Sequence, residues 1–179
     1  MSTQNQHQFW TDIATPLGVL TLTAHERALT GLFFPGRGPA RDEATRAPER
    51  FEQVIAQLDQ YFNGMRRQFE LEIDFSGGTA FQQAVWRELL TIPYGATVSY
   101  GQIAGRLGRL ERVRAVGAAN GANPISVIVP CHRVIGADGR LTGYGGGLHR
   151  KQALLDMEAA AGHGRHAVLE LAPRQLTLI

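Results

Sequence analysis

The feature that most constrains this fold is a change in hydrophobic periodicity near the middle of the chain. Residues 9–36 alternate β-forming residues with turn residues, and Pro16-Leu17-Gly18 and Pro35-Gly36 mark a hairpin and a stop. After Thr79 the apolar residues recur at helical spacing instead. We therefore expect an α+β fold, with a small antiparallel sheet and a helix first and a mostly helical part after it.

The first part is expected to contain one helix and one further strand. Residues 49–64, ERFEQVIAQLDQYFNG, place apolar side chains at helical spacing and end in Asn-Gly. Residues 69–75, FELEIDF, return to strand alternation and are followed by Gly77-Gly78. We predict two domains, an N-terminal α/β domain at 1–78 and a C-terminal domain at 79–179.

The second part is expected to contain several helices and one buried strand. The helices are predicted at residues 80–92, 100–108, 112–122 and 148–162. Thr79 and Ser99 can cap the first two of them. Residues 125–130, ISVIVP, form an aliphatic run that predicts a strand.

The two middle helices form a helix-turn-helix pattern. The second is flanked by arginines and is rich in small residues that would let it lie close to a nucleic-acid groove: Arg109, Arg112, Arg114, Ala115, Gly117, Ala118, Ala119 and Gly121. A tightly packed helix pair in an ordinary core is the alternative explanation.

Charge is distributed unevenly along the chain. The net charge is +2 overall, but −3 over residues 1–78 and +5 over residues 79–179. A basic half suits a polyanion, because each neutralised phosphate releases counterions. A solvated basic surface is the more ordinary explanation of charge alone.

Composition restricts the class of protein. The hydrophobic share of 44% and the charged share of 19% are typical of a folded soluble protein. A single cysteine cannot form an internal disulfide, and the scattered histidines lack zinc-ligand spacing. No apolar run reaches the roughly 20 residues of a membrane helix, and no signal peptide is evident. We expect a cytoplasmic protein without a membrane segment, a metal or another cofactor.

The lone cysteine, Cys131, lies between Pro130 and His132-Arg133. A nearby imidazole or cation favours the reactive thiolate. Adjacent residues on an extended strand point to opposite faces, so His132 need not touch Cys131 directly, and a water could relay the proton. Glu158, on the last helix, is the acid best placed in the sequence to hold the other ring nitrogen. A small buried hydrophobe is the alternative role for this cysteine.

Residues 114–158 resemble the O6-alkylguanine-DNA alkyltransferases, the methylated-DNA–protein-cysteine methyltransferases. The motif Pro-Cys-His-Arg-Val at 130–134 carries the likeness, and FQQAVWRELLTIPYGATVSYGQIA at 81–104 extends it. The resemblance implies a DNA repair protein that transfers an alkyl group from O6 of guanine, and from O4 of thymine, irreversibly to Cys131. The implied partner is double-stranded DNA, bound in the minor groove by a monomer, with cooperative binding left open.

The resemblance also implies roles for individual residues. His132, held by Glu158, would draw off the thiol proton through a water. Tyr100 would hydrogen-bond the guanine, and Asn123 would tie the helix-turn-helix to the active-site strand. Arg114 would take the place of the guanine turned out of the stack. The substrate pocket would include Val134, Tyr144, Gly145 and Gly146.

The sequence departs from the family pattern at two points. Some relatives hold zinc in the N-terminal domain, which one cysteine cannot do. Gly145 stands where some relatives have serine, and we expect this to enlarge the pocket and admit bulkier alkyl groups.

Three other functions are weighed against alkyl transfer. A non-catalytic alkyltransferase-like protein binds alkylated DNA and recruits repair factors, but such proteins replace the cysteine that Cys131 retains. A methyl-sensing transcription regulator needs a cysteine cluster that is lacking here. A Cys-His hydrolase would release its acyl product over many cycles, whereas alkyl transfer to the cysteine ends at one equivalent.

Overall fold

The computed structural model describes residues 8–162 and 177–178. An antiparallel sheet opens the chain and consists of β1 (Gln8–Thr15), β2 (Gly18–His25) and β3 (Ala28–Phe33). In the hairpin Thr15 pairs with Gly18, whose φ of +100° suits the tight turn, as predicted. A short strand, β6 (Thr177–Leu178), pairs with β1, so the order is β3-β2-β1-β6. The rest of the C-terminal tail lies outside the described residues.

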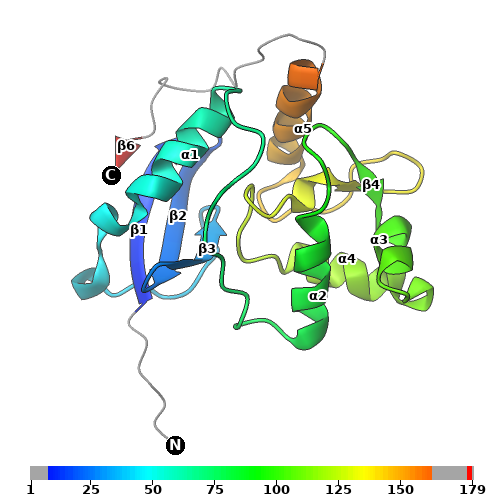
Figure 1. The fold of residues 1–179 in the computed structure, drawn as a ribbon, viewed down its shortest axis with the longest axis horizontal. Coiled ribbons are helices and arrows are strands. Elements are labelled where there is room, and N and C mark those ends of the chain that lie inside the picture. The colour runs from blue at the N-terminus through cyan, green and yellow to red at the C-terminus, as the bar shows by residue number, and fades with distance from the viewer. Residues whose placement is uncertain (1–7, 163–176, 179) are drawn as a thin grey trace, which may run out of the picture.

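Helix α1 (Glu52–Phe62) lies across one face of this sheet (Figure 1). Val54, Leu58 and Phe62 are buried, with the four-residue spacing of one helix face. The helix predicted at 49–64 is therefore confirmed, although its first turn, Pro48–Phe51, is a 3-10 helix.

The strand predicted at 69–75 is wrong. This segment makes one isolated bridge, between Ile73 and Leu29 of β3. The Gln57 side chain, on α1, accepts from the Glu70 N–H at 2.8 Å and donates to the Glu70 carbonyl at 3.0 Å. Because α1 satisfies these backbone groups, the segment does not need to extend the sheet ladder.

The second half of the chain is helical, as predicted. Its helices are α2 (Ala80–Leu89), α3 (Tyr100–Arg106), α4 (Val113–Gly121) and α5 (Leu148–Gly162). Thr79 and Ser99 each form a reciprocal capping box with the glutamine three residues later, which explains why α2 and α3 begin where they do. A turn at Gly108, whose φ is +65°, leads from α3 to α4 and completes the helix-turn-helix.

The strand predicted at 125–130 is also wrong. Ile125 bridges to Leu32, and the residues after it form tight turns in which Val127 has a φ of +71°. The Ile128 N–H donates to the Ser126 carbonyl at 2.8 Å. An aliphatic run predicts burial, which is observed, but burial does not require an extended backbone.

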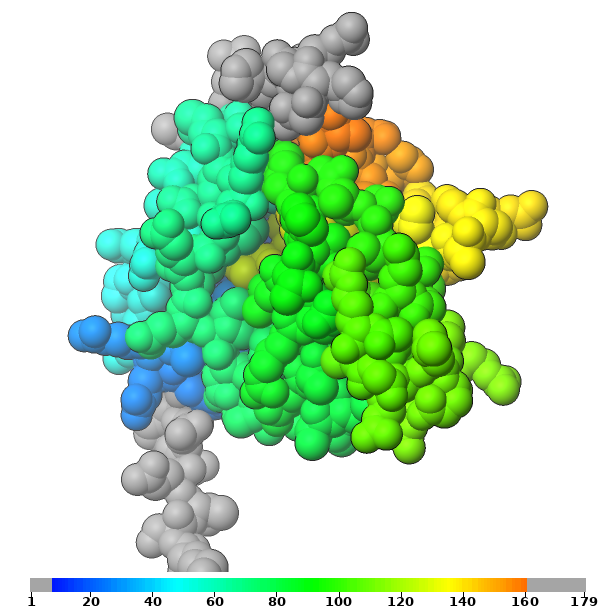
Figure 2. Space-filling model, turned by 45° about the vertical axis from the view of Figure 1, so that its right-hand side comes forward, coloured from blue at the N-terminus to red at the C-terminus, as the bar shows by residue number. Residues whose placement is uncertain are grey.

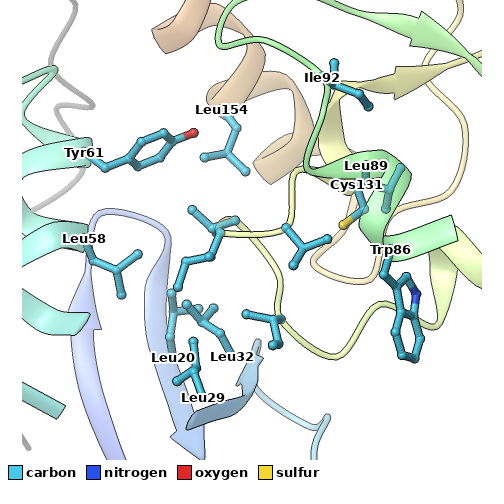
Figure 3. Close-up of a cluster of buried hydrophobic side chains, with 14 of the residues drawn as sticks. Leu20, Leu29, Leu32, Leu58, Tyr61, Trp86, Leu89, Ile92, Cys131 and Leu154 are labelled. Carbon is cyan, nitrogen blue, oxygen red and sulfur yellow. The ribbon is translucent and has the colours of Figure 1, made fainter. Parts of the chain in front are cut away.

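One continuous apolar core joins the sheet to the helices. Figure 3 shows Leu20, Leu29 and Leu32 of the sheet within the same cluster as Trp86 and Leu89 of α2. The core runs across residue 78, and the division into two domains there stays a prediction. Among the described residues, no helix is both long and apolar enough to cross a membrane.

A surface groove of about 480 Å³ opens between the segment after α1 and the end of α2 (Figure 2). Arg67, Ile128 and Arg133 are among its lining residues. The guanidinium of Arg133 therefore reaches from the groove toward the buried polar cluster described next.

Candidate active site

Cys131 begins a 3-10 turn, Cys131–Arg133, that leads into β5 (Val134–Ile135). β5 pairs in parallel with β4 (Val98–Ser99), which fixes the turn beside the start of α3. Cys131 is 4% exposed and His132 is fully buried. A reacting group must therefore enter the protein from its surface to contact the thiol.

Asn123 holds this turn from the end of α4. Its Nδ2 donates to the Val129 carbonyl at 2.9 Å and to the Cys131 Sγ at 3.0 Å, and its Oδ1 accepts from the Ile125 N–H at 3.0 Å. The Asn123 side-chain amide thus provides one tie between the helix-turn-helix and the cysteine segment. The same amide is a hydrogen-bond donor to the sulfur.

His132 pairs with Glu158 of α5. Its Nε2 lies 3.0 Å from Glu158 Oε1, and both side chains are fully buried. A carboxylate only accepts hydrogen bonds, so Nε2 carries the hydrogen and Nδ1 is left with a free lone pair. Nδ1 is buried and has no hydrogen-bond partner among the described residues. The imidazole can therefore accept one proton at Nδ1.

The Glu158 carboxylate also receives hydrogen bonds from outside the sequence-predicted site. Arg133 donates from Nη2 to Oε1 at 2.8 Å and from Nε to Oε2 at 2.9 Å, and the Gly95 N–H donates to Oε2 at 3.0 Å. Burial alone would raise the pKa of Glu158, but His132 and Arg133 hold this pKa well below its usual range. The carboxylate is therefore a fixed negative charge beside the imidazole.

Burial dominates the acidity of the thiol. It raises the pKa of Cys131, and the hydrogen bond from Asn123 only partly opposes this. Lys151 favours the thiolate, but burial outweighs it in the unbound protein, and Arg133, the expected cation, is paired with Glu158 instead. Burial also lowers the pKa of His132, against the attraction of Glu158. The resting pair is a neutral thiol and a neutral imidazole that can act as a base.

Of the predicted pocket positions, Tyr144 lies close enough to Cys131 to interact with its charge. Tyr100 Oη accepts from Thr142 Oγ1 at 2.9 Å. Tyr144 has a buried hydroxyl without a partner among the described residues, and its pKa is raised by burial and by the charge that Cys131 would carry. The extra room expected at Gly145 is reached by the end of the exposed Arg37 side chain, whose Nη1 would meet an added Cβ. The ring of Phe34 occupies the equivalent space at Gly146.

Two family models match the chain. Residues 80–160 match the 6-O-methylguanine DNA methyltransferase, DNA binding domain. Residues 9–75 match the 6-O-methylguanine DNA methyltransferase, ribonuclease-like domain. The chain belongs to the 6-O-methylguanine DNA methyltransferase family.

Relatives in this methyltransferase family match most of the chain. The methylated-DNA–protein-cysteine methyltransferase of Mycobacterium bovis is 49% identical over 168 residues, which cover 93% of this chain and 95% of the relative. The inducible enzyme of Bacillus subtilis is 46% identical over 128 residues, 72% of this chain and 68% of the relative. The crystal structure of Mycobacterium tuberculosis OGT in complex with DNA has a TM-score of 0.83 and 49% identity, and the match covers 91% of this chain and 98% of that one.

The helix-turn-helix of this family member exposes two arginines and several small residues along α4. Arg112, Arg114, Ala115, Ala118 and Gly121 are exposed along α4. Gly117 is half-buried, and an added Cβ there would lie 3.7 Å from the Tyr100 ring. Ala119 was predicted on this surface, but it is 3% exposed, so its side chain does not form part of it. Its carbonyl accepts a hydrogen bond from Trp86 Nε1. The hydrogen bond to Trp86 instead fixes α4 on α2.

Sequence analysis missed several polar residues that complete the site of this methyltransferase. Tyr61 of α1 donates to Glu158 Oε1 at 2.6 Å, and Lys151 of α5 donates from Nζ to the Val134 carbonyl at 2.6 Å. Asn120 Nδ2 lies 3.4 Å from the Cys131 carbonyl. One signal for Tyr61 existed, because a tyrosine on the apolar face of a helix needs a partner for its hydroxyl.

Proposed function

We propose that this protein repairs DNA by moving an alkyl group from O6 of guanine to Cys131 Sγ. The sulfur bonds to the alkyl carbon while the carbon–oxygen bond breaks, and the oxygen stays with the guanine. The resulting thioether is not reversed, so each molecule acts once. The observation that carries the proposal is a buried thiol held by Asn123 beside an imidazole whose far nitrogen is fixed by Glu158.

Before transfer, the thiol of Cys131 and the imidazole of His132 are both neutral. The thiol proton passes to Nδ1 of His132 through a water, and Glu158 stabilises the imidazolium that forms. The hydrogen bond from Asn123 supports the growing negative charge on sulfur. Tyr100 supplies the hydrogen bond and a proton to the departing guanine, and its phenolate regains a proton as the imidazolium of His132 gives up the one it took from the thiol. Its own hydrogen is available because Tyr100 Oη already accepts one from Thr142.

The buried position of Cys131 sets the geometry of the substrate. A thiol that is 4% exposed cannot meet a base that remains stacked in a duplex, so the guanine must be turned out into the protein. The unpaired buried hydroxyl of Tyr144 supports this, because unsatisfied buried polar groups mark positions where a ligand or a water binds. Backbone groups of Cys131, Val134 and Gly145 would read the base edge.

Double-stranded DNA carrying O6-alkylguanine is the proposed partner. The exposed small residues of α4 permit close approach to the minor groove, and Arg114 would fill the place of the everted base. We expect a monomer to suffice, because the residues named above all come from one chain. A free cysteine that must stay reduced in order to react also suits the reducing cytoplasm.

Stoichiometry tests this function. The protein is incubated with an excess of duplex DNA that bears O6-methylguanine, and the guanine restored per molecule of protein is counted. One equivalent is expected from the parent protein and none from Cys131→Ser. Several equivalents would indicate turnover, and tight binding to alkylated DNA without transfer would favour the non-catalytic alternative.

A further inference from the structure

Glu158 is contacted by the N-terminal part of the chain as well as by its own neighbourhood. Tyr61, near the end of α1, is separated from Glu158 by 97 positions and donates to its Oε1 at 2.6 Å. Figure 3 shows the Tyr61 hydroxyl pointing away from α1, toward the helix that carries Leu154. The same Oε1 lies 3.0 Å from His132 Nε2. A residue of the first half of the chain therefore shares the oxygen that holds the proposed base.

We infer that Tyr61 is a positioning residue for alkyl transfer, whose hydroxyl fixes Glu158 Oε1 and thereby sets the orientation and basicity of His132. The inference rests on the proposed function, because it assigns a partner to the same proton relay. It also gives α1 a direct part in the chemistry of a thiol that lies on a distant segment of the chain.

The hydroxyl of Tyr61, more than its ring, carries this role. The ring is fully buried and packs against Phe62, Phe69 and Tyr94, with centroid distances of 5.4, 5.3 and 5.9 Å. Phenylalanine would preserve those contacts. The hydrogen bond to Glu158 must be donated by tyrosine, because the carboxylate is ionised and can only accept. Burial, followed by the charge of Glu158, raises the pKa of Tyr61, so the donor stays protonated.

Removal of this donor changes the charge that His132 faces. Tyr61, His132 and Arg133 all donate to the same Oε1 atom, so the loss of one leaves more negative charge for the others. The pKa of His132 then rises. The transfer step needs a neutral imidazole, so the acidic limb of its pH profile should move to higher pH.

The other charged and titratable groups around this pair stay in place. Arg133 and Lys151 lower the pKa of His132, and Glu158 raises it. Tyr94 lies close enough to Glu158 for that charge to raise the Tyr94 pKa. Cys131, directly before His132, carries the proton that the relay must remove. A shift in Tyr61→Phe can therefore be assigned to the lost hydroxyl.

The experiment compares Tyr61→Phe with Tyr94→Phe in the full chain. Tyr94 packs edge-on against Tyr61, but its buried hydroxyl has no hydrogen-bond partner among the described residues. Single-turnover transfer from O6-methylguanine duplex DNA is measured across the pH range, together with DNA affinity and urea unfolding. Tyr61→Phe should transfer about tenfold more slowly, with the acidic limb at higher pH and DNA affinity unchanged. Tyr94→Phe should behave like the parent protein.

Two further variants separate positioning from a merely structural effect. In a Glu158→Gln background Tyr61→Phe should cause no further slowing, because both changes act on one contact. Tyr61→3-fluorotyrosine keeps the ring, strengthens the donor and should move the acidic limb to lower pH, which keeps the test informative even if Tyr61→Phe folds poorly.

The outcomes distinguish the two proposals. If the parent protein transfers no alkyl group, the proposed function fails. If the parent transfers and Tyr61→Phe has the same rate and pH profile, only the role of Tyr61 is overturned. An equal loss of rate in the parent and Glu158→Gln backgrounds would also overturn it.

Discussion

Asn123 Nδ2 donates to the Sγ of Cys131 at 3.0 Å and to the carbonyl of Val129 at 2.9 Å. One amide at the end of α4 therefore shapes the turn before the cysteine and contacts the nucleophile itself. This contact also links α4, the helix proposed to bind DNA, to the sulfur.

Asn123→Ala should weaken both folding and transfer. It leaves the Ile125 N–H buried without its partner, whereas the Val129 carbonyl still accepts from the Cys131 N–H, so the free energy of unfolding should fall by about 1–3 kcal/mol. The loss of the donor to sulfur should also raise the pKa of Cys131. Urea unfolding and the pH dependence of thiol alkylation measure the two effects.

Asn63→Ala is the matched control for that change. Asn63 makes a comparable amide bond to the Asp59 carbonyl, but at the partly exposed end of α1. Asn63→Ala should lower the free energy of unfolding by about 1 kcal/mol or less and leave thiol reactivity unchanged. If the two substitutions changed the free energy of unfolding and the thiol reactivity equally, the burial of Asn123 would not explain its effect.

The glycines of the pocket loop should differ in their tolerance of a methyl group. A Cβ at Gly146 would lie 2.6 Å from the Phe34 ring, whereas nothing lies within 4 Å of a Cβ at Gly143. Gly146→Ala should therefore lower the free energy of unfolding by about 1–3 kcal/mol, through overpacking against a ring. Gly143→Ala should stay within about 0.5 kcal/mol of the parent. Thermal and urea unfolding give the comparison, and the reverse order would refute the packing described at Phe34.

Acid should destabilise the protein in two steps. The pKa of His132 is lowered by burial, so below about pH 6.5 the unfolded state binds a proton that the folded state does not. The pKa of Glu158 is also lowered, so a second loss of stability begins below about pH 4.3. Stability therefore rises with pH through both windows and is complete above the first.

Glu158→Gln should remove the second window. It should also lower stability at neutral pH by about 3–5 kcal/mol, because Arg133 is left buried without its counter-charge. Urea unfolding between about pH 7 and pH 3 tests both statements. A variant that lost stability below about pH 4 as steeply as the parent would show that Glu158 is not the titrating group.

Arg114→Ala should separate DNA handling from chemistry. Arg114 is exposed on α4, so its loss should slow transfer from duplex DNA about tenfold or more, given that base extrusion costs a few kcal/mol. Transfer from a free O6-alkylguanine base should be unchanged. Arg27→Ala, the same charge change on an exposed turn before β3, is the control and should leave both rates near the parent values. Equal slowing with the free base would mean that Arg114 acts on the thiol pocket.

Much of the fold could be predicted from local sequence signals. Thr79 and Ser99 begin α2 and α3 through side-chain caps, and Gly18 allows the β1–β2 turn. Residues 125–130 could not be assigned correctly, because a wholly buried run shows no periodicity that separates a strand from a series of turns. Their backbone is directed by Asn123, which precedes them and offers no strand or helix signal.

The site could be predicted only in part. Cys131, His132 and Glu158 could be placed together from the motif and the final helix. Tyr61 could not be placed there, because its contact with Glu158 depends on how α1 packs against α5. The sequence could not predict the raised pKa of the Cys131 thiol either. Burial causes it, and burial depends on the fold and not on which residues are adjacent in the sequence.

The mass of the Cys131 peptide shows whether this sulfur receives the alkyl group. The protein is incubated with duplex DNA bearing O6-methylguanine, digested and analysed by mass spectrometry, with unmodified duplex as the control. Transfer of one methyl group predicts a gain of one CH2, about 14 Da, on that peptide, saturating near one per molecule. An unmodified Cys131 after the DNA has been repaired, or a methyl group on another residue, would contradict the account.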